Sequence, residues 1–387
     1  MRFKHVAWPE IAIFAFAAVS ASGYAPTKDK IEFKTIDGVP HVFNPAKPLK
    51  GTIKLEIERT RTIDPYEQPE VGMRMILFFH RGEKGGVVLL DPNSAEGHRF
   101  GPDGKYLGLL TKKGQGPGEF SPQQGYYAYL FGNDVFVFGG QKVARFDSDG
   151  KLLQERTLKS HHYASVDATR FLTENIVRDE KGNQTKTLQI VEFDFKEKEN
   201  KTDLLKAVNV GMIRNPNGRG GISEPWATPG LFYAADPSRG YIFCGINTKY
   251  EIWIKDLAGK DVLVIQRAFE NVKAKRDDVA KMMAWAAKEE RTKWILSAYP
   301  DRFVAIKDIF SLPKGYLAAF RVTGPEQFEI DVFSPKGEYL YALVPPVGIE
   351  LRQVQFFSTG FAVLEMEGDS FAYREYRIKN LPEIFGK

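Results

Sequence analysis

Two adjacent histidines are the clearest candidates in this sequence for metal binding or proton transfer. His161 and His162 stand shortly before Asp167. Zinc takes imidazole and carboxylate ligands, and histidine titrates near neutral pH. Adjacent residues of a strand point to opposite faces, so both rings would not readily reach one ion if this segment is extended. We therefore treat His161 and His162 as weak binding candidates and predict no metal site from them.

A second candidate is the most loop-like stretch, residues 214–221, which reads Arg-Asn-Pro-Asn-Gly-Arg-Gly-Gly. Guanidinium groups such as those of Arg214 and Arg219 bind carboxylates and phosphates through paired hydrogen bonds. Binding sites are often located on loops, although most loop arginines only face water. We favour a solvated connection and keep Arg214 and Arg219 as weak binding candidates.

A third candidate is a glycine-rich string that could cradle an anion with its backbone N–H groups. It consists of Gly114, Gln115, Gly116, Pro117, Gly118, Glu119 and Phe120. A phosphate-binding P-loop needs Gly-Lys-Ser or Gly-Lys-Thr leading into a helix, whereas Glu119 and Phe120 lead towards another predicted strand. We interpret the string as a structural connection in which Phe120 is buried and the glycines make the bend.

Other kinds of chemistry lack a motif. The sequence has no Gly-x-Ser-x-Gly elbow and no His-Glu-x-x-His helix. Cys244 is the only cysteine, which excludes intramolecular disulfides and thiolate zinc sites, and we expect it in the core. The 54 Lys and Arg are spread among 49 Asp and Glu, so nucleic-acid binding is not expected. No motif calls for a cofactor.

The first residues resemble an export signal. Arg2 and Lys4 precede an apolar run over residues 11–18, and small residues favour cleavage after Ala21. No cysteine follows the run, so a lipid anchor has no acceptor. We predict a signal peptide over residues 1–21, an extended lead-in over 22–50, and a periplasmic or secreted protein without a membrane span after cleavage. The alternative is that the segment stays uncleaved as an anchor, since Pro9 and Glu10 interrupt its apolar region.

The elements that must position these residues follow from a repeated hairpin pattern. A strand end, a turn of three or four residues and a second alternating strand recur along the chain. The clearest copies are residues 99–107, 145–153 and 332–340, and weaker copies centre on Phe193, Ile254 and Tyr376. Six copies at spacings as short as one propeller blade, about 40–50 residues, predict an all-β, six-bladed β-propeller over residues 51–387.

Two further segments complete this prediction. Residues 53–59 alternate as a strand but have no hairpin of their own, so we expect them to close the last blade near Tyr373 and Tyr376. Residues 277–296 carry apolar side chains at helical spacing, which predicts a helix inserted between blades. We expect that helix to cap one face of the ring, with Trp285 or Trp294 as its anchor.

With these repeats in place, the string 114–120 resembles the hallmark of the bacterial six-bladed β-propeller proteins related to NHL-repeat and TolB-like propellers. The resemblance covers most of the mature chain. Many of these proteins are exported and have no assigned function. The resemblance therefore implies a fold and a compartment rather than a reaction.

The sequence supports two classes of function. The first is a binding or scaffolding module of the cell envelope, whose loops meet a protein, peptide or glycan. The alternative is a metal-dependent propeller hydrolase or lyase of the lactonase type, in which inward-facing carboxylates and amides would hold a divalent cation in the central channel. We favour the binding module, since no motif in the chain supports the cation.

Overall fold

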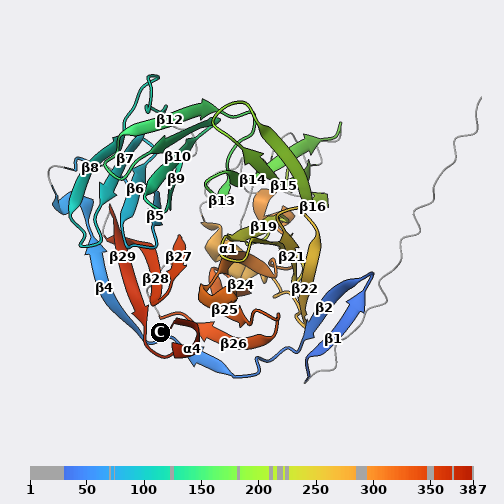
Figure 1. Cartoon of the computed structure of the whole chain (residues 1–387). Helices are drawn as coiled ribbons and strands as arrows, with labels where there is room; N and C mark the ends of the chain where they lie inside the picture. The colour runs from blue at the N-terminus through green and yellow to red at the C-terminus, as the bar shows by residue number, and fades with distance from the viewer. Residues whose placement is uncertain are drawn as a thin grey trace, which may run out of the picture.

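The computed structural model describes residues 30–385, except residues 69–70, 74, 123–125, 181–183, 209–211, 216–220, 223–225, 285–293, 347–352 and 368–369. The strands form a ring of six radial blades around a central axis (Figure 1). In the four strands that every blade has, neighbours are antiparallel and the first strand lies nearest the axis. The chain is a six-bladed β-propeller, which confirms the predicted fold class.

The blades follow one another along the chain. Blade 1 contains β5 (Phe78–Arg81), β6 (Val87–Asp91), β7 (Glu96–Phe100) and β8 (Tyr106–Thr111). Blade 2 contains β9 (Tyr126–Phe131), β10 (Asp134–Gly139), β11 (Lys142–Phe146) and β12 (Leu152–Thr157). Blade 3 contains β13 (Ala164–Asp167), β14 (Arg170–Arg178), β15 (Gln184–Phe193) and β16 (Glu199–Val208).

The second half of the ring has the same strand order. Blade 4 contains β19 (Leu231–Asp236), β20 (Tyr241–Ile246), β21 (Glu251–Asp256) and β22 (Asp261–Arg267). Blade 5 contains β23 (Ile306–Ser311), β24 (Leu317–Gly324), β25 (Gln327–Phe333) and β26 (Tyr339–Val344). Blade 6 contains β27 (Val354–Phe357), β28 (Gly360–Glu367), β29 (Ser370–Ile378) and β4 (Ile57–Ile63). Short helical elements are η1 (Pro65–Glu67), η3 (Pro313–Gly315) and α4 (Pro382–Phe385).

The six hairpin copies correspond to the third strands of the six blades. In five of them, the first turn residue donates its N–H to the carbonyl oxygen four residues later, as Asp147 does to Lys151 at 3.0 Å. The copy at Ile254, counted among the weaker ones, contains a complete Asp-Leu-Ala-Gly turn from Asp256 to Gly259, and Gly259 has φ +84°. The repeat is thus one turn geometry used five times, as expected from local turn chemistry.

Arginines join these turns to the neighbouring blade. Arg99 of blade 1 donates to the carbonyl oxygen of Asp149 in the turn of blade 2 at 2.7 Å. Arg156 of blade 2 donates in the same way to Lys198 in the turn of blade 3 at 2.8 Å. Arg61 of blade 6 donates to Pro102 in the turn of blade 1 at 2.7 Å. Hydrogen bonds from arginine side chains to the turn carbonyls therefore connect these successive blades.

The ring is closed by the N-terminal part of the chain, as predicted, but with different bounds. β4 pairs antiparallel with β29, and Ile63 lies opposite Tyr373 while Arg59 lies opposite Tyr376. The first part of the predicted segment belongs elsewhere, because β3 (Thr52–Lys54) pairs parallel with β26 as a fifth strand of blade 5. Leu55 lies between β3 and β4, where the chain crosses from one blade to the next.

The lead-in expected over residues 22–50 contains a hairpin in its described part. β1 (Glu32–Ile36) and β2 (Val39–Asn44) pair with each other, and β2 runs parallel to β22 at the rim of blade 4. Asn44 donates to the carbonyl oxygen of Gly337 at 2.9 Å and accepts from the N–H of Tyr339 at 2.7 Å. The hairpin is therefore attached to both blade 4 and blade 5.

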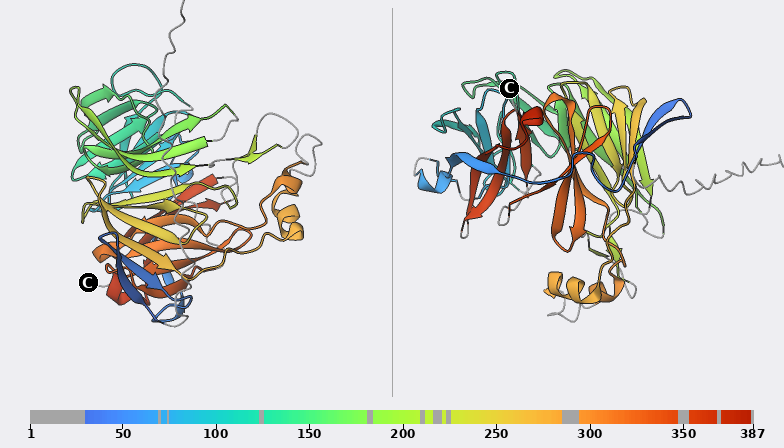
Figure 2. Two further views of the ribbon diagram at one scale, coloured as in Figure 1. Left: turned by 90° about the vertical axis from the view of Figure 1, so that its right-hand side faces the viewer. Right: turned by 90° about the horizontal axis from the view of Figure 1, so that it is seen from below.

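The predicted helical insertion lies between blades 4 and 5. It contains α1 (Arg276–Met282) and α3 (Trp294–Ala298), which stand off the ring on one face (Figure 2). A single helix over 277–296 is not observed, because α1 ends before Met283, whose φ of −103° is not helical. Trp294 packs against the apolar cluster of the insertion, and Trp285 lies outside the described residues.

The core consists of apolar layers between adjacent blades. Cys244 lies in the layer between blades 3 and 4 with Leu172, Leu188 and Ile242, each of which is fully buried. Burial raises the pKa of the Cys244 thiol to about 12, so the thiol behaves as a small apolar group. None of the described helices has the length and apolar character needed to cross a bilayer.

Candidate functional site

The connections between blades leave the ring on one face, which we call the loop face. Strands alternate in direction within each blade, so every connection from a rim strand to the next innermost strand starts on the same side. By the strand order, the connections on this face contain string 114–120, His161, His162 and Arg214. The α1–α3 insertion stands on the same face (Figure 2). Connections of this kind commonly carry binding sites because the blades hold them rigidly.

Three tyrosines from consecutive blades lie on the loop-face side of the innermost strands. Tyr127 is the second residue of β9, Tyr163 directly precedes β13, and Tyr233 is the third residue of β19. β13 contacts both β9 and β19, so these tyrosines stand on neighbouring segments beside the axis. We call these three residues the tyrosine cluster.

The side chains of Tyr127 and Tyr163 differ in their surroundings. The hydroxyls of Tyr127 and Tyr163 have no hydrogen-bond partner within the described part of the chain. Tyr163 is 37% exposed, whereas the Tyr127 ring is held between Phe78 at 4.9 Å and His162 at 5.2 Å between ring centroids. Burial raises the pKa of Tyr127, so its phenol stays neutral at physiological pH.

An ion pair borders the tyrosine cluster. The hydroxyl of Tyr233 donates to Glu174 Oε1 at 3.3 Å, and Glu174 Oε2 lies 2.8 Å from Lys186 Nζ. Both side chains of the pair come from blade 3, from β14 and β15. Burial raises the pKa of Tyr233, and the charge of Glu174 beside it acts in the same direction. The Tyr233 hydroxyl is therefore hydrogen-bonded to a carboxylate that is itself paired with a lysine.

The two predicted histidines are placed in different environments. His161 is exposed, whereas His162 is buried and stacks on Phe138 with 3.9 Å between ring centroids. His162 Nε2 lies 2.9 Å from Ser165 Oγ, but burial lowers the pKa of His162 to about 3. Such an imidazole is a poor base near pH 7, and its Nδ1 has no partner in the described structure. The contact supports the wall behind Tyr127.

The two predicted arginines contribute little that can be described. Arg214 belongs to β17 (Ile213–Arg214), which pairs with β18 (Gly221–Ile222) in the connection between blades 3 and 4. Arg219 lies outside the described residues. Arg214 is therefore on the same face as the tyrosine cluster, and its role as a binding residue stays a prediction.

The glycine-rich string binds carboxylates of its own chain. The N–H of Gly116 donates to Glu119 Oε2 at 3.0 Å, and the N–H of Gly118 donates to Glu155 Oε2 at 2.7 Å. The hydrogen bond from Gly116 lowers the pKa of Glu119. Phe120 is 2% exposed, and Lys142 Nζ donates to the carbonyl oxygen of Glu119 at 3.0 Å. A phosphate would have to displace Glu119, which supports the structural interpretation.

Asp308 is an unusual carboxylate on an innermost strand, β23. Its Oδ1 accepts the N–H of Ile309 at 2.8 Å, and it has no side-chain partner in the described structure. Part of its surface is accessible, yet burial raises its pKa to about 6, only partly opposed by Lys307. An acid kept at such a position without a partner is a candidate functional group.

The Asp308→Asn substitution is expected to stabilise the protein above pH 6 and to have little effect near pH 4. Below about pH 4 the carboxyl is protonated in both states, and as the pH rises through about 6 the folded state loses stability because it must ionise a desolvated group. Urea unfolding should show a gain of about 1–3 kcal/mol at pH 8 relative to pH 4. Asp301→Asn, at a side chain 97% exposed, is the control and should show no such difference. Equal gains for both variants would contradict the assignment.

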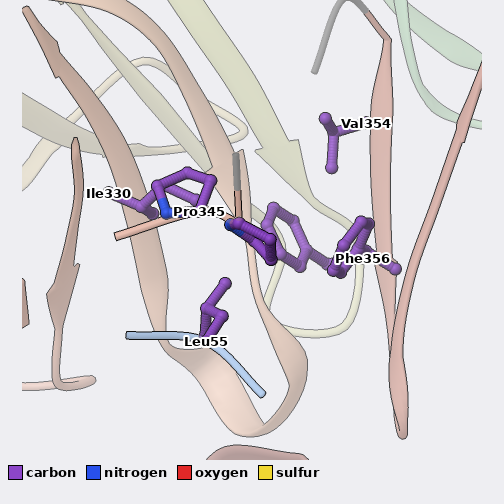
Figure 3. Close-up of a pocket in the computed structure, with 7 residues that line it drawn as sticks. Leu55, Ile330, Pro345, Val354 and Phe356 are labelled. Atoms are coloured by element: carbon purple, nitrogen blue, oxygen red, sulfur yellow. The ribbon is translucent and has the colours of Figure 1, made fainter. Parts of the chain in front are cut away.

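A cavity between two blades is too small to hold a ligand. An apolar cavity lies between blades 5 and 6, where Leu55, Pro345 and Phe356 surround it (Figure 3). Its volume of about 10 Å³ leaves room for about one water molecule. In the part of the chain that the structure describes, no group of three or more His, Cys, Asp or Glu side chains could hold a metal ion.

Solved structures similar to this chain share little sequence with it. No family model matches the sequence, and no curated protein matches it. A member of the DUF4221 family from Bacteroides vulgatus is 10% identical over 92% of this chain and all of its own, with a TM-score of 0.47. A gluconolactonase from Xanthomonas campestris is 10% identical over 78% of this chain and 87% of its own, with a TM-score of 0.36.

A virginiamycin B lyase from Staphylococcus aureus is 12% identical over 84% of this chain and all of its own, also with a TM-score of 0.36. At these identities and scores the likenesses carry no argument about function. The fold is established by the strand order of this chain itself.

The sequence argument did not identify the tyrosine cluster, the ion pair or Asp308. Tyr127, Tyr163 and Tyr233 stand in aromatic strands where most tyrosines serve packing. The signal that could have identified them is their place at the start of innermost strands. Finding those strands requires the blade boundaries, which the hairpin repeat does not define around residues 160–300.

Proposed function

We propose that this propeller is an extracytoplasmic binding module whose ligand contacts the tyrosine cluster on the loop face. The observation that carries the proposal is the placement of these tyrosines on neighbouring innermost segments of the loop face. The hydroxyls of Tyr127 and Tyr163 make no hydrogen bond in the described structure. Groups that converge from separate blades and retain unused hydrogen-bonding capacity are typical of ligand sites.

The rigidity of the wall behind the cluster supports binding. The Tyr127 ring packs against His162, which packs against Phe138 and Phe171. Because these rings are fixed by core contacts, little conformational entropy is lost when a ligand orders the tyrosine side chains. The α1–α3 insertion is on the same face, and Lys307 of β23 lies 4.3 Å from the ring of Trp226 in the insertion's apolar cluster.

The proposed location outside the cytoplasm rests on the first residues, which resemble a signal peptide. These residues lie outside the described part of the chain. The alternative of a metal-dependent hydrolase or lyase stays a prediction, and no specific contact favours it. Asp308 alone supplies one carboxylate, whereas a divalent cation takes several oxygen ligands.

The Tyr163→Ala variant tests the proposal. Binding is measured by isothermal titration calorimetry with three sets of probes: neutral hexasaccharides, acidic hexasaccharides and neutral eight-residue peptides. We expect at least one set to bind the wild-type protein and the variant to bind that set at least tenfold more weakly, because removal of an aromatic contact costs about 1–3 kcal/mol. Tyr163 is partly exposed and makes no hydrogen bond through its side chain in the described structure, so the fold should tolerate the change.

The control is Leu153→Ala on rim strand β12, where the side chain is 45% exposed. It should bind as the wild type does. Saturable binding that Tyr163→Ala leaves unchanged would place the ligand elsewhere and refute the proposed site. Absence of binding by all three sets would refute it as well.

A further inference from the structure

We infer that the rim of blade 1 is a second binding surface, on which β8 takes an extended segment of a partner protein as an added parallel strand. This surface is separate from the tyrosine cluster, because β8 is the outermost strand of its blade and the cluster lies on innermost segments. The partner segment has apolar side chains on alternate residues and an acidic residue at its C-terminal end.

Two blades of this protein already have a strand added to their outer edge. β2 pairs parallel with β22 in blade 4, and β3 pairs parallel with β26 in blade 5. Both additions begin at the same place in the repeat, at Val264 and at Ala342, each of which lies eight residues after the first turn residue, Asp256 or Ser334. Val264 and Ala342 are both buried. The rim strands of this propeller can therefore accept an extended segment at a position that the repeat fixes.

Strand β8 is apolar in the same way, but no strand lies beside its outer edge in the described part of the chain. Leu109 holds the place of Ala342, eight residues after the first turn residue Gly101. Its side chain is 44% exposed, and that of Leu107 on the same strand is 55% exposed. An uncovered apolar edge is a template for pairing with another chain.

The rim strands β12 and β16 also have uncovered edges in the described structure, but they carry charges. The place of Leu109 is taken by Glu155 in β12 and by Thr202 in β16, which Asp203 follows. Charged side chains on an edge strand oppose the addition of another strand. β8 has no charged residue within its bounds, so it lacks this protection.

A groove of about 280 Å³ lies beside β8 at the junction with blade 2. Leu109 and Leu110 line it from blade 1, and Phe146 and Leu152 line it from blade 2. In peptide recognition by strand addition, the backbone pairs with the edge while pockets beside the edge receive alternate side chains. The groove supplies such a pocket for an apolar side chain.

The charge at the end of β8 favours an acidic residue in the partner. Lys113 is exposed and has no ion pair in the described structure. In blade 5, the N–H of Leu55 donates to the carbonyl oxygen of Val344 at the end of β26, and Glu56 follows Leu55. A segment placed on β8 in the same way would bring the residue that corresponds to Glu56 towards Lys113, where a carboxylate is complementary.

The probe is a fluorescein-labelled peptide of residues 49–56 of this chain, because these residues lie along β26 in blade 5. Fluorescence polarisation measures its binding to the full protein. We expect saturable binding that Leu107→Lys and Leu109→Lys each weaken about tenfold or more, since a lysine on the edge opposes pairing. Both side chains are exposed, so the fold should tolerate the changes. Leu153→Lys is the matched control, because Leu153 holds the place of Leu107 in β12 and is 45% exposed; it should bind as the wild type does.

Two altered peptides test how the segment binds. N-methylation of Leu55 keeps every side chain but removes the donor that bonds Val344 in blade 5, and it should weaken binding about tenfold. The substitution Glu56→Lys in the peptide should weaken binding about 2–5-fold. Unchanged binding of the N-methylated peptide would overturn strand addition, and unchanged binding of the Glu56→Lys peptide would overturn the acidic end of the partner segment.

The remaining outcomes decide the surface and its occupant. If the peptide does not bind, or binds Leu109→Lys as well as the wild type, the binding surface on β8 is overturned. If the wild type sediments as a dimer that Leu109→Lys makes monomeric, the edge pairs with a second copy of this chain, which overturns the assignment of a partner protein. Leu109→Lys should leave unchanged any saccharide binding that Tyr163→Ala weakens, so this inference and the proposed function can fail separately.

Discussion

Asp331→Ala is expected to lower the free energy of unfolding by about 3–5 kcal/mol. The carboxylate is fully buried between blades 4 and 5, where it lies 3.1 Å from both Arg267 and Arg321. The hydroxyls of Tyr250 and Tyr339 also donate to it, at 2.5 and 2.8 Å. Alanine would leave the Arg267 guanidinium without its carboxylate partner and the two phenols without their acceptor, while Arg321 would keep its ion pair with Glu329. A buried charge that loses its partner is strongly destabilising.

Urea unfolding followed by circular dichroism measures this effect. The control is Glu192→Ala, which removes a carboxylate from a surface pair with Lys198 whose side chains are about half exposed. Exposed pairs contribute about 0–1 kcal/mol, so the control should unfold close to the wild type. Similar midpoints for the two variants would show that the Asp331 network contributes no more than a surface pair.

The second large effect concerns ring closure. Leu55→Pro is expected to destabilise the protein by about 3 kcal/mol or more. The N–H of Leu55 donates to the carbonyl oxygen of Val344 at 3.1 Å, and its side chain is 8% exposed in the core between blades 5 and 6. Proline would remove this donor and the apolar contacts at the point where the chain passes from β3 to β4.

Lys30→Pro is the matched control, since Lys30 is exposed and precedes the first described strand. The urea midpoint of Leu55→Pro should fall well below those of the wild type and the control. If both proline variants unfold at the same urea concentration, the crossing segment does not contribute to closure. Glu375 also contributes to closure of the ring, because it links blade 6 to blade 1. Its carboxylate accepts a hydrogen bond from Arg81 Nε at 3.0 Å and another from the Tyr373 hydroxyl at 2.6 Å.

Much of the architecture was predictable because the repeat depends on local chemistry. A turn such as Asp147–Lys151 is stabilised by its own residues, with the Asp147 carboxylate accepting the N–H groups of Asp149 and Lys151 at 3.0 and 2.9 Å. Such a turn can be recognised from consecutive residues of the sequence. The bounds of the closing strand could not be recognised in this way, because pairing of β3 with β26 and of β4 with β29 depends on distant segments.

The candidate site was beyond prediction for a related reason. The glycine string was recognisable, but the carboxylate of Glu155 that accepts from Gly118 comes from another strand of blade 2. His162 was recognisable as a titratable group, yet only its stacking on Phe138 shows that it is buried.

The sequence by itself determined the number of blades, the turn that repeats in them and the presence of a helical insertion, because each depends on neighbouring residues and a fixed period. Only the tertiary structure decided which side chains meet. Tyr127, Tyr163 and Tyr233 are far apart along the chain and come together because closing the ring places the innermost strands of blades 2, 3 and 4 side by side. Contacts of this kind follow from the ring geometry, which no local stretch of sequence encodes.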